Sequence, residues 1–126
     1  MKIFLFESIF IFFICFITVI FGAPNNSPNG FGTVITVSTN SSEIKIQDNG
    51  ENSFATFASI YNLGTNIIFC AVNCSSTSTF ENVVSKNQAV PISESQIFTF
   101  QAPNRQISSV WLKTTNGTST VMIGAY

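Results

Sequence analysis

The chain has 126 residues and a formal net charge of −1, with 9% charged residues, 45% hydrophobic residues, no histidine and three cysteines. So few cations, balanced by a similar number of carboxylates, cannot neutralise a phosphate backbone, and we expect no nucleic-acid partner. The absence of histidine removes the commonest general base and metal ligand. The composition therefore argues against an enzyme, and we expect no catalytic residue, bound metal or cofactor.

The first 21 residues form a strongly apolar segment, with Lys2 near its start and an unbroken apolar run from Ile9 to Phe21. An apolar core of about 13 residues after a basic start fits a secretory signal peptide better than a spanning helix, which needs roughly 20. We expect cleavage after Gly22, so that 1–22 is a signal peptide, with an uncleaved signal anchor as the alternative. Both place the remainder outside the cytoplasm, with membrane contact only through an uncleaved segment.

Residues 23–32 are rich in Pro, Asn and Gly and predict an extended linker. Residues 33–126 then show the period-two hydrophobicity of β-strands, as in Glu43–Gln47. Seven or eight short strands at spacings of about 8 to 12 residues predict an all-β domain, an antiparallel β-sandwich or jelly roll. We expect no helix outside the signal segment, and a polar loop at 73–82. The strand-like runs are 33–38, 43–47, 54–62, 67–72, 89–92, 96–100, 107–114 and 118–123.

Turn residues punctuate these runs. Asp48-Asn49-Gly50 ends one strand, while Leu63–Asn66 and Asn116-Gly117 each predict a hairpin between the runs on either side. Pro91 cannot donate a hydrogen bond to a ladder, so its strand should lie at a sheet edge or a bulge.

Cys70 and Cys74 are the cysteines that remain after cleavage, and an even number in an oxidising compartment favours a disulfide. On a continuous strand their Cα atoms would lie about 13 Å apart, whereas a disulfide tolerates no more than about 7 Å. A bridge therefore requires the strand to end near Ala71 or Val72 and to turn. Two free buried thiols and intermolecular pairing are the alternatives.

Three Asn-X-Ser/Thr sequons, at Asn40, Asn73 and Asn116, are candidate glycosylation sites, whereas a fourth at Asn25 is weakened by the Pro28 that follows it. Asn40 should be modified first, because it falls in the expected loop between two strands. Trp111 and Tyr61 are candidate ligand contacts, since flat amphipathic rings stack on sugars and anchor protein partners. A single Trp inside an apolar strand is, however, more typical of a core.

The order of these segments resembles that of small single-domain β-sandwich proteins found as minor structural or decoration components of virus particles, tailed bacteriophages especially. The resemblance spans 33–126 and implies a non-enzymatic role in a particle surface. It is carried by Ala58–Asn66 leading into Ile67–Phe69, by Val90–Ser95 entering Ile97–Phe100, and by the closing segment 107–123.

From the sequence we expect a non-enzymatic structural or interaction module outside the cytoplasm, such as a minor component of a virion surface. Abundant hydroxyl and amide groups suit contact with protein partners, self-assembly or glycan contact. The alternative is a secreted eukaryotic binding protein or effector with a glycan or protein ligand.

Overall fold

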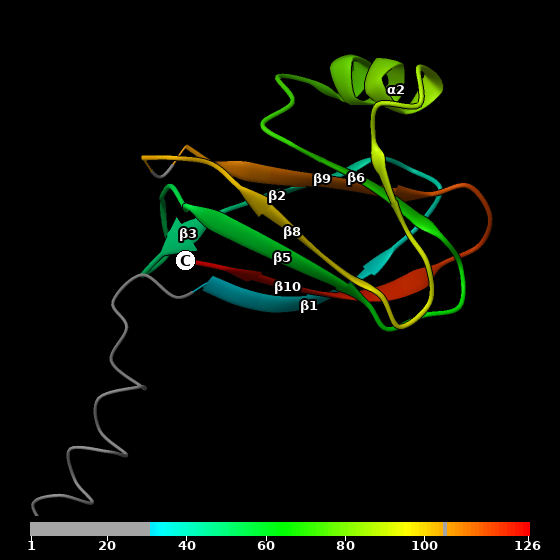
Figure 1. Ribbon diagram of the computed structural model, residues 1–126, viewed down its shortest axis with the longest axis horizontal. Coiled ribbons are helices and arrows are strands. Elements are labelled where there is room, and N and C mark those ends of the chain that lie inside the picture. The colour runs from blue at the N-terminus through cyan, green and yellow to red at the C-terminus, as the bar shows by residue number, and fades with distance from the viewer. Residues whose placement is uncertain (1–30, 105) are drawn as a thin grey trace, which may run out of the picture.

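The computed structural model of the protein describes residues 31–104 and 106–126, and the predictions for residues 1–30 lie outside them. Two four-stranded antiparallel sheets pack face to face, and a small two-stranded sheet lies beside them (Figure 1). We call β1-β10-β5-β8 sheet A and β2-β9-β6-β7 sheet B. The elements are β1 (Phe31–Val37), β2 (Ser42–Lys45), β3 (Gln47–Asp48), β4 (Glu51–Asn52), β5 (Phe57–Asn62), β6 (Ile68–Val72), α2 (Thr77–Ser85), β7 (Val90–Ile92), β8 (Ile97–Gln101), β9 (Ser109–Thr114) and β10 (Ser119–Ala125).

The strand order is that of a jelly roll. The first strand pairs with the last, β1 with β10, and the second with the one before the last, β2 with β9. Consecutive strands of the main sandwich alternate between the sheets, except for β6 and β7, which pair with each other in sheet B, and this arrangement is typical of two interlocked Greek keys. This confirms the predicted antiparallel β-sandwich.

Alternating side chains from the two sheets fill the space between them. Strand β10 shows the pattern clearly, because Val121 and Ile123 are buried between the sheets while Thr120 and Met122 face outward. Leu112 of β9 and Ile60 of β5 are fully buried in the same core. Most inward positions are apolar, so burial of these side chains is the main contribution that stabilises the sandwich.

Both hairpins predicted between long strands are wrong. Strand β5 belongs to sheet A and β6 to sheet B, so Leu63–Asn66 carries the chain from one sheet to the other. Asn116-Gly117 does the same between β9 and β10. The turn residues lie where expected, but turn chemistry does not specify whether the flanking strands pair or cross between sheets.

Two other turn predictions are confirmed. Asn49 and Gly50 adopt positive φ angles of 51° and 85°, and they close the β3–β4 hairpin. This is the left-handed conformation that Asn-Gly hairpin turns require. Pro91 lies on β7 at the edge of sheet B, where its missing N–H leaves no ladder bond unmade.

The predicted polar loop at 73–82 is partly wrong, because the helix α2 begins within it at Thr77. The Ser76 side chain caps the helix by accepting a hydrogen bond from the Thr79 amide at 3.2 Å. Phe80 is fully buried, as expected if it packs on the sheet. Among the described residues, no helix is long and apolar enough to span a membrane.

Candidate binding surface

The two sheets differ in what covers their outer faces. Helix α2 lies over the outer face of sheet B, whereas no described element lies over the outer face of sheet A (Figure 1). The four strands of sheet A, with sequences FGTVITV, STVMIGA, FASIYN and IFTFQ, contain no charged residue. Charged residues of the described chain lie instead on sheet B, the β3–β4 hairpin, the helix and the loops. An uncovered apolar face of this kind is typical of a binding surface.

The register of sheet A aligns four large side chains in one row across its outer face. Val34 pairs with Met122, Met122 with Tyr61, and Tyr61 with Ile97. We call this row the ridge. The exposed fractions of Val34, Met122 and Ile97 are 60%, 44% and 63%, so the ridge presents much of its apolar surface to solvent.

A row of small residues, which we call the trough, runs beside the ridge. Gly32 pairs with Gly124, Gly124 with Ser59, and Ser59 with Thr99. A Cβ atom added at Gly32 or Gly124 would meet no other atom within 4 Å, so open space lies above both glycines. The Ser59 and Thr99 hydroxyl oxygens lie 2.8 Å apart and hydrogen-bond to each other, which satisfies these polar groups within the sheet.

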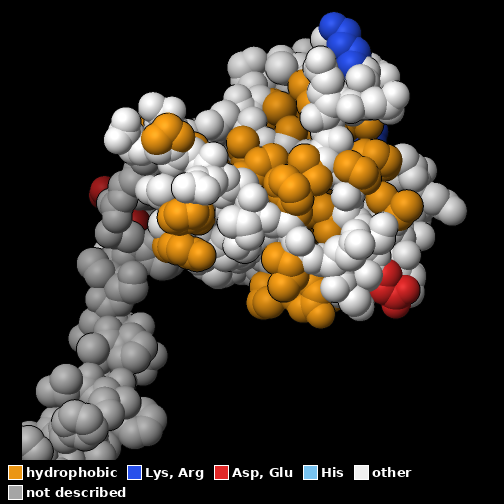
Figure 2. All heavy atoms as spheres, viewed as in Figure 1, with side chains coloured by type: hydrophobic (Ala, Val, Ile, Leu, Met, Phe, Trp, Pro, Cys, Tyr) orange, Lys and Arg blue, Asp and Glu red, His pale blue; other side chains and the backbone are white. Residues whose placement is uncertain are grey.

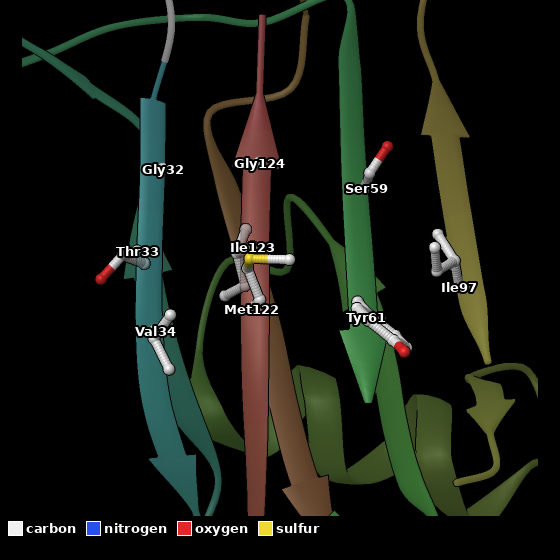
Figure 3. A pocket seen from close by; sticks show the side chains of 9 residues that line it. All are labelled: Gly32, Thr33, Val34, Ser59, Tyr61, Ile97, Met122, Ile123 and Gly124. Atoms are coloured by element: carbon white, nitrogen blue, oxygen red, sulfur yellow. The ribbon is translucent and has the colours of Figure 1, made fainter. Parts of the chain in front are cut away.

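Together these rows form a groove with a volume of about 460 Å³ (Figure 3). Its lining includes all four ridge residues and three of the four trough residues, Gly32, Gly124 and Ser59. Nearly all of the lining surface is apolar. The groove is therefore suited to an apolar occupant rather than to a charged one.

The edges of the sheets differ in the same way as their faces. In sheet B, the edge strand β2 carries Glu43 and Lys45, and the edge strand β7 carries Pro91. Charges and prolines at such positions discourage pairing with another chain. The edge strands of sheet A, β1 and β8, contain neither charged residues nor proline. Figure 2 shows hydrophobic side chains gathered over β8, and the charged side chains visible in this view lie at its margins.

The structure separates the two aromatic residues predicted as ligand contacts. Tyr61 lies on the ridge of sheet A, facing the groove (Figure 3). Trp111 lies on β9 in sheet B with an exposed fraction of 5%, and its ring is 5.8 Å from that of Phe80 in α2. Its indole Nε1 has no hydrogen-bond partner. Tyr61 is thus placed to contact a ligand, whereas Trp111 belongs to the interior beneath the helix.

The predicted bridge between Cys70 and Cys74 is not formed, and both are free thiols. Strand β6 does end at Val72, as a bridge would require, but Cys70 is packed in the core between the sheets while Cys74 lies beyond the strand end and is half-buried. Burial raises the pKa of the Cys70 thiol to about 12 and also raises the pKa of Cys74. The Cys70 thiol is therefore an unreactive core group.

The three sequons lie in different environments. Asn40 and Asn116 are exposed in the β1–β2 and β9–β10 connections. Asn73 uses its side chain internally, because its Nδ2 donates to the Gln106 carbonyl at 2.7 Å and its Oδ1 accepts from the Ser108 amide at 2.8 Å. A glycan on Asn73 would replace a hydrogen on this Nδ2 and disturb that network.

Sequence reasoning identified one member of the groove, Tyr61, and missed the rest. The ridge and the trough come from strands at both ends and in the middle of the chain, so no local motif marks them. One sequence signal of the groove does exist in β1 and β10. In each strand a glycine and a large apolar residue occupy consecutive outward positions, namely Gly32 with Val34 and Gly124 with Met122. In the part of the chain that the structure describes, no three His, Cys, Asp or Glu side chains cluster as metal ligands.

No protein-family model and no curated protein matches the chain. Solved structures do match it in fold. Hydroxypropylphosphonic acid epoxidase from S. wedmorenis, in complex with fosfomycin, is 8% identical and has a TM-score of 0.50, with 79% of this chain and 45% of that chain covered. A cupin-2 domain protein from Shewanella frigidimarina is 6% identical with a TM-score of 0.43 (76% and 69% covered), and a de novo designed double-stranded β-helix is 14% identical with a TM-score of 0.45 (74% and 95% covered).

At such low identity the likeness to the epoxidase concerns the fold alone. Proteins of this fold include an enzyme, so the fold does not decide between catalysis and binding. None of the three is a virion decoration protein, and the resemblance drawn from the sequence stays a prediction.

Proposed function

We propose that the protein is a non-enzymatic structural or interaction module that works outside the cytoplasm and binds a protein partner through the ridge and trough of sheet A. The observation that supports this most strongly is the contrast between the sheets. Sheet B is covered by α2 and has charged or proline-bearing edges, whereas the described strands of sheet A are uncharged, uncovered and grooved. Burial of the ridge would provide the hydrophobic contribution that protein interfaces depend on.

A place in a particle surface, such as that of a virion, is one setting for this module. A small sandwich with one inert, helix-covered side and one apolar side is suited to attachment to a larger assembly. The N-terminal segment, if it acts as a signal peptide or anchor, would deliver the domain to the outside of a membrane.

The second candidate is a secreted binding protein with a smaller ligand. The groove volume of about 460 Å³ lies within the range of small-molecule sites, and Tyr61 offers a ring for stacking. A glycan is disfavoured as the occupant because the groove provides few polar partners for sugar hydroxyls, and unpaired buried hydroxyls are costly. An apolar ligand or a protein side chain fits this lining better.

The test is sedimentation of the native protein from its source under mild conditions, compared with two variants of equal charge change. Val34 on the ridge and Phe54 outside sheet A are almost equally exposed, at 60% and 59%. We expect wild-type protein and Phe54→Lys to sediment in a species larger than the free chain, and Val34→Lys to be released from it because an unpaired charge would be buried at the contact. Migration of all three as a small free species would contradict the structural role and favour the second candidate.

A further inference from the structure

We infer that the partner on this surface is a second copy of the same chain, docked so that the ridge of each copy lies in the trough of the other. This inference rests on the proposed function, since it names the occupant of the same groove. It follows from the way large and small residues alternate along each strand of sheet A.

On each strand of sheet A, the ridge residue and the trough residue occupy consecutive outward positions. A two-fold axis that runs parallel to the two rows and midway between them would exchange the rows. Each large side chain would then face the small residue of the same strand in the other copy. The facing pairs are Val34 with Gly32, Met122 with Gly124, Tyr61 with Ser59, and Ile97 with Thr99.

Such a contact is isologous, meaning that the same patch is used on both copies and must be complementary to itself. The open space above Gly32 and Gly124 is what a large side chain from the second copy needs. Sheets that pack face to face lie about 10 Å apart with strand directions within about 30°, a spacing that side chains of this size fill.

The absence of charge favours a second copy over an unrelated protein. Around a two-fold axis, a charged residue near the axis meets its own copy, so like charges face each other and oppose association. The described strands of sheet A carry no charge that could do this. A surface that binds a different protein does not need to be complementary to itself. On sheet A, by contrast, each strand carries one large and one small outward residue in the positions that self-complementarity requires.

The experiment measures self-association of the protein, expressed from its full coding sequence and purified as processed, by sedimentation over a concentration series. We expect wild-type protein to form a dimer. The variant Gly124→Met fills the trough where Met122 of the second copy would lie, and a Cβ atom at this position meets no other atom of its own chain within 4 Å. We expect it to weaken dimer formation by roughly a hundredfold, because two bulky side chains would meet at each of the two symmetric contacts.

Rescue distinguishes a second copy from any other partner. Adding Met122→Gly to Gly124→Met exchanges the large and the small residue on β10, and under the two-fold axis each Met would again face a Gly. We expect the double variant to dimerise within about tenfold of wild type. Phe54→Lys is the control, because it changes an exposed residue outside sheet A, and it should leave the dimer intact.

Folding of each variant is checked by thermal unfolding, and Gly32→Val, which fills the trough on β1, replaces Gly124→Met if the latter is unfolded. A monomeric wild-type protein at every concentration, a dimer unaffected by the trough variants, or a double variant without rescue would overturn the inference. If the protein is monomeric but Val34→Lys still releases it from a larger partner, self-docking fails and the proposed function stands. If Val34→Lys changes neither the self-association of the purified protein nor its sedimentation from the native source, both the self-docking inference and the proposed function fail.

Discussion

Asn62 is a buried amide at the end of β5, and all of its hydrogen-bonding capacity is used. Its Nδ2 donates to the carbonyl oxygens of Asn66 at 2.8 Å and Ile92 at 2.9 Å. Its Oδ1 accepts from the Gly64 amide at 3.1 Å and from the Ser119 hydroxyl at 2.7 Å. Because Ile92 belongs to sheet B and Ser119 to sheet A, this one side chain ties the 63–66 crossover to both sheets.

Replacing Asn62 with Leu keeps a similar volume but leaves the Ile92 carbonyl and the Ser119 hydroxyl buried without this partner. We expect a loss of about 2 to 4 kcal/mol in the free energy of unfolding, measured by urea denaturation. Asn66→Ala is the matched control, because its side chain bonds only the exposed Thr118 carbonyl, and it should cost less than about 1 kcal/mol. Equal losses in the two variants would contradict the special role of Asn62.

At the scale of elements, α2 contacts sheet B through both apolar and polar side chains. Phe80 packs on Trp111, with ring centroids 5.8 Å apart. Glu81 pairs with Lys113 at 2.8 Å and accepts a hydrogen bond from Ser41. The hydrogen bonds from Lys113 and Ser41 lower the pKa of Glu81. The ionised Glu81 carboxylate therefore contributes to stability fully at a pH above the ordinary carboxyl pKa. This contribution is lost as the pH falls through the lowered pKa of Glu81 in the folded protein.

Phe80→Ala removes the apolar contact of the helix, and we expect it to destabilise the protein by about 3 to 4 kcal/mol. Trp111 should emit at short wavelength and resist soluble quenchers in the wild type, and should shift to longer wavelength in this variant. Glu81→Gln leaves the apolar contact in place, and its partly exposed ion pair should contribute less than about 1 kcal/mol. A wild-type emission spectrum typical of exposed Trp would show that α2 does not cover the ring.

Strand positions could be predicted because alternation is a local property of the chain. The runs at 54–62 and 107–114 contain β5 and β9. Strand β5 buries alternate residues, whereas β9 is buried on both faces because α2 covers Trp111 on its outer face. Alternation does not identify the partner strand, so Leu63–Asn66 was assigned to a hairpin although it crosses between sheets. Helix α2 was missed because its Ser and Thr residues have weak helix propensity, and its apolar residues at helical spacing, Phe80 with Val83 and Val84, are few.

At the scale of the whole molecule, the sequons give a test of where the chain matures. In cells that glycosylate secreted proteins, we expect the mature protein to begin near Ala23 and to carry a glycan at Asn40. We expect Asn73 to be unmodified in folded protein, because a glycan there would disturb the hydrogen bond from its Nδ2 to the Gln106 carbonyl. Peptide mass spectrometry measures both properties. Loss of the added mass in Asn40→Gln is the control, and full occupancy of Asn73 in folded protein would contradict the assigned hydrogen bonds.

The groove could not have been predicted from the sequence, because it exists only through the register of four strands. Val34 and Met122 come from opposite ends of the described domain and become neighbours when β1 pairs with β10. A single sequence offers no signal for that pairing. Composition indicates few charges on the exterior, but from its hydroxyl and amide groups we expect a polar contact surface rather than the apolar face of sheet A.

The pairing of the first strand with the last also determines when the domain can fold. Strand β10 lies between β1 and β5. Sheet A therefore lacks this strand, which pairs with both neighbours, until residues 119–125 have been synthesised. Contacts between Phe31 and Ala125 close nearly the whole described chain into one loop, and such long-range pairing is slow. Sheet A therefore cannot assemble in the nascent chain before residues 119–125 have left the ribosome, and until then β1 and β5 have no partner strand between them.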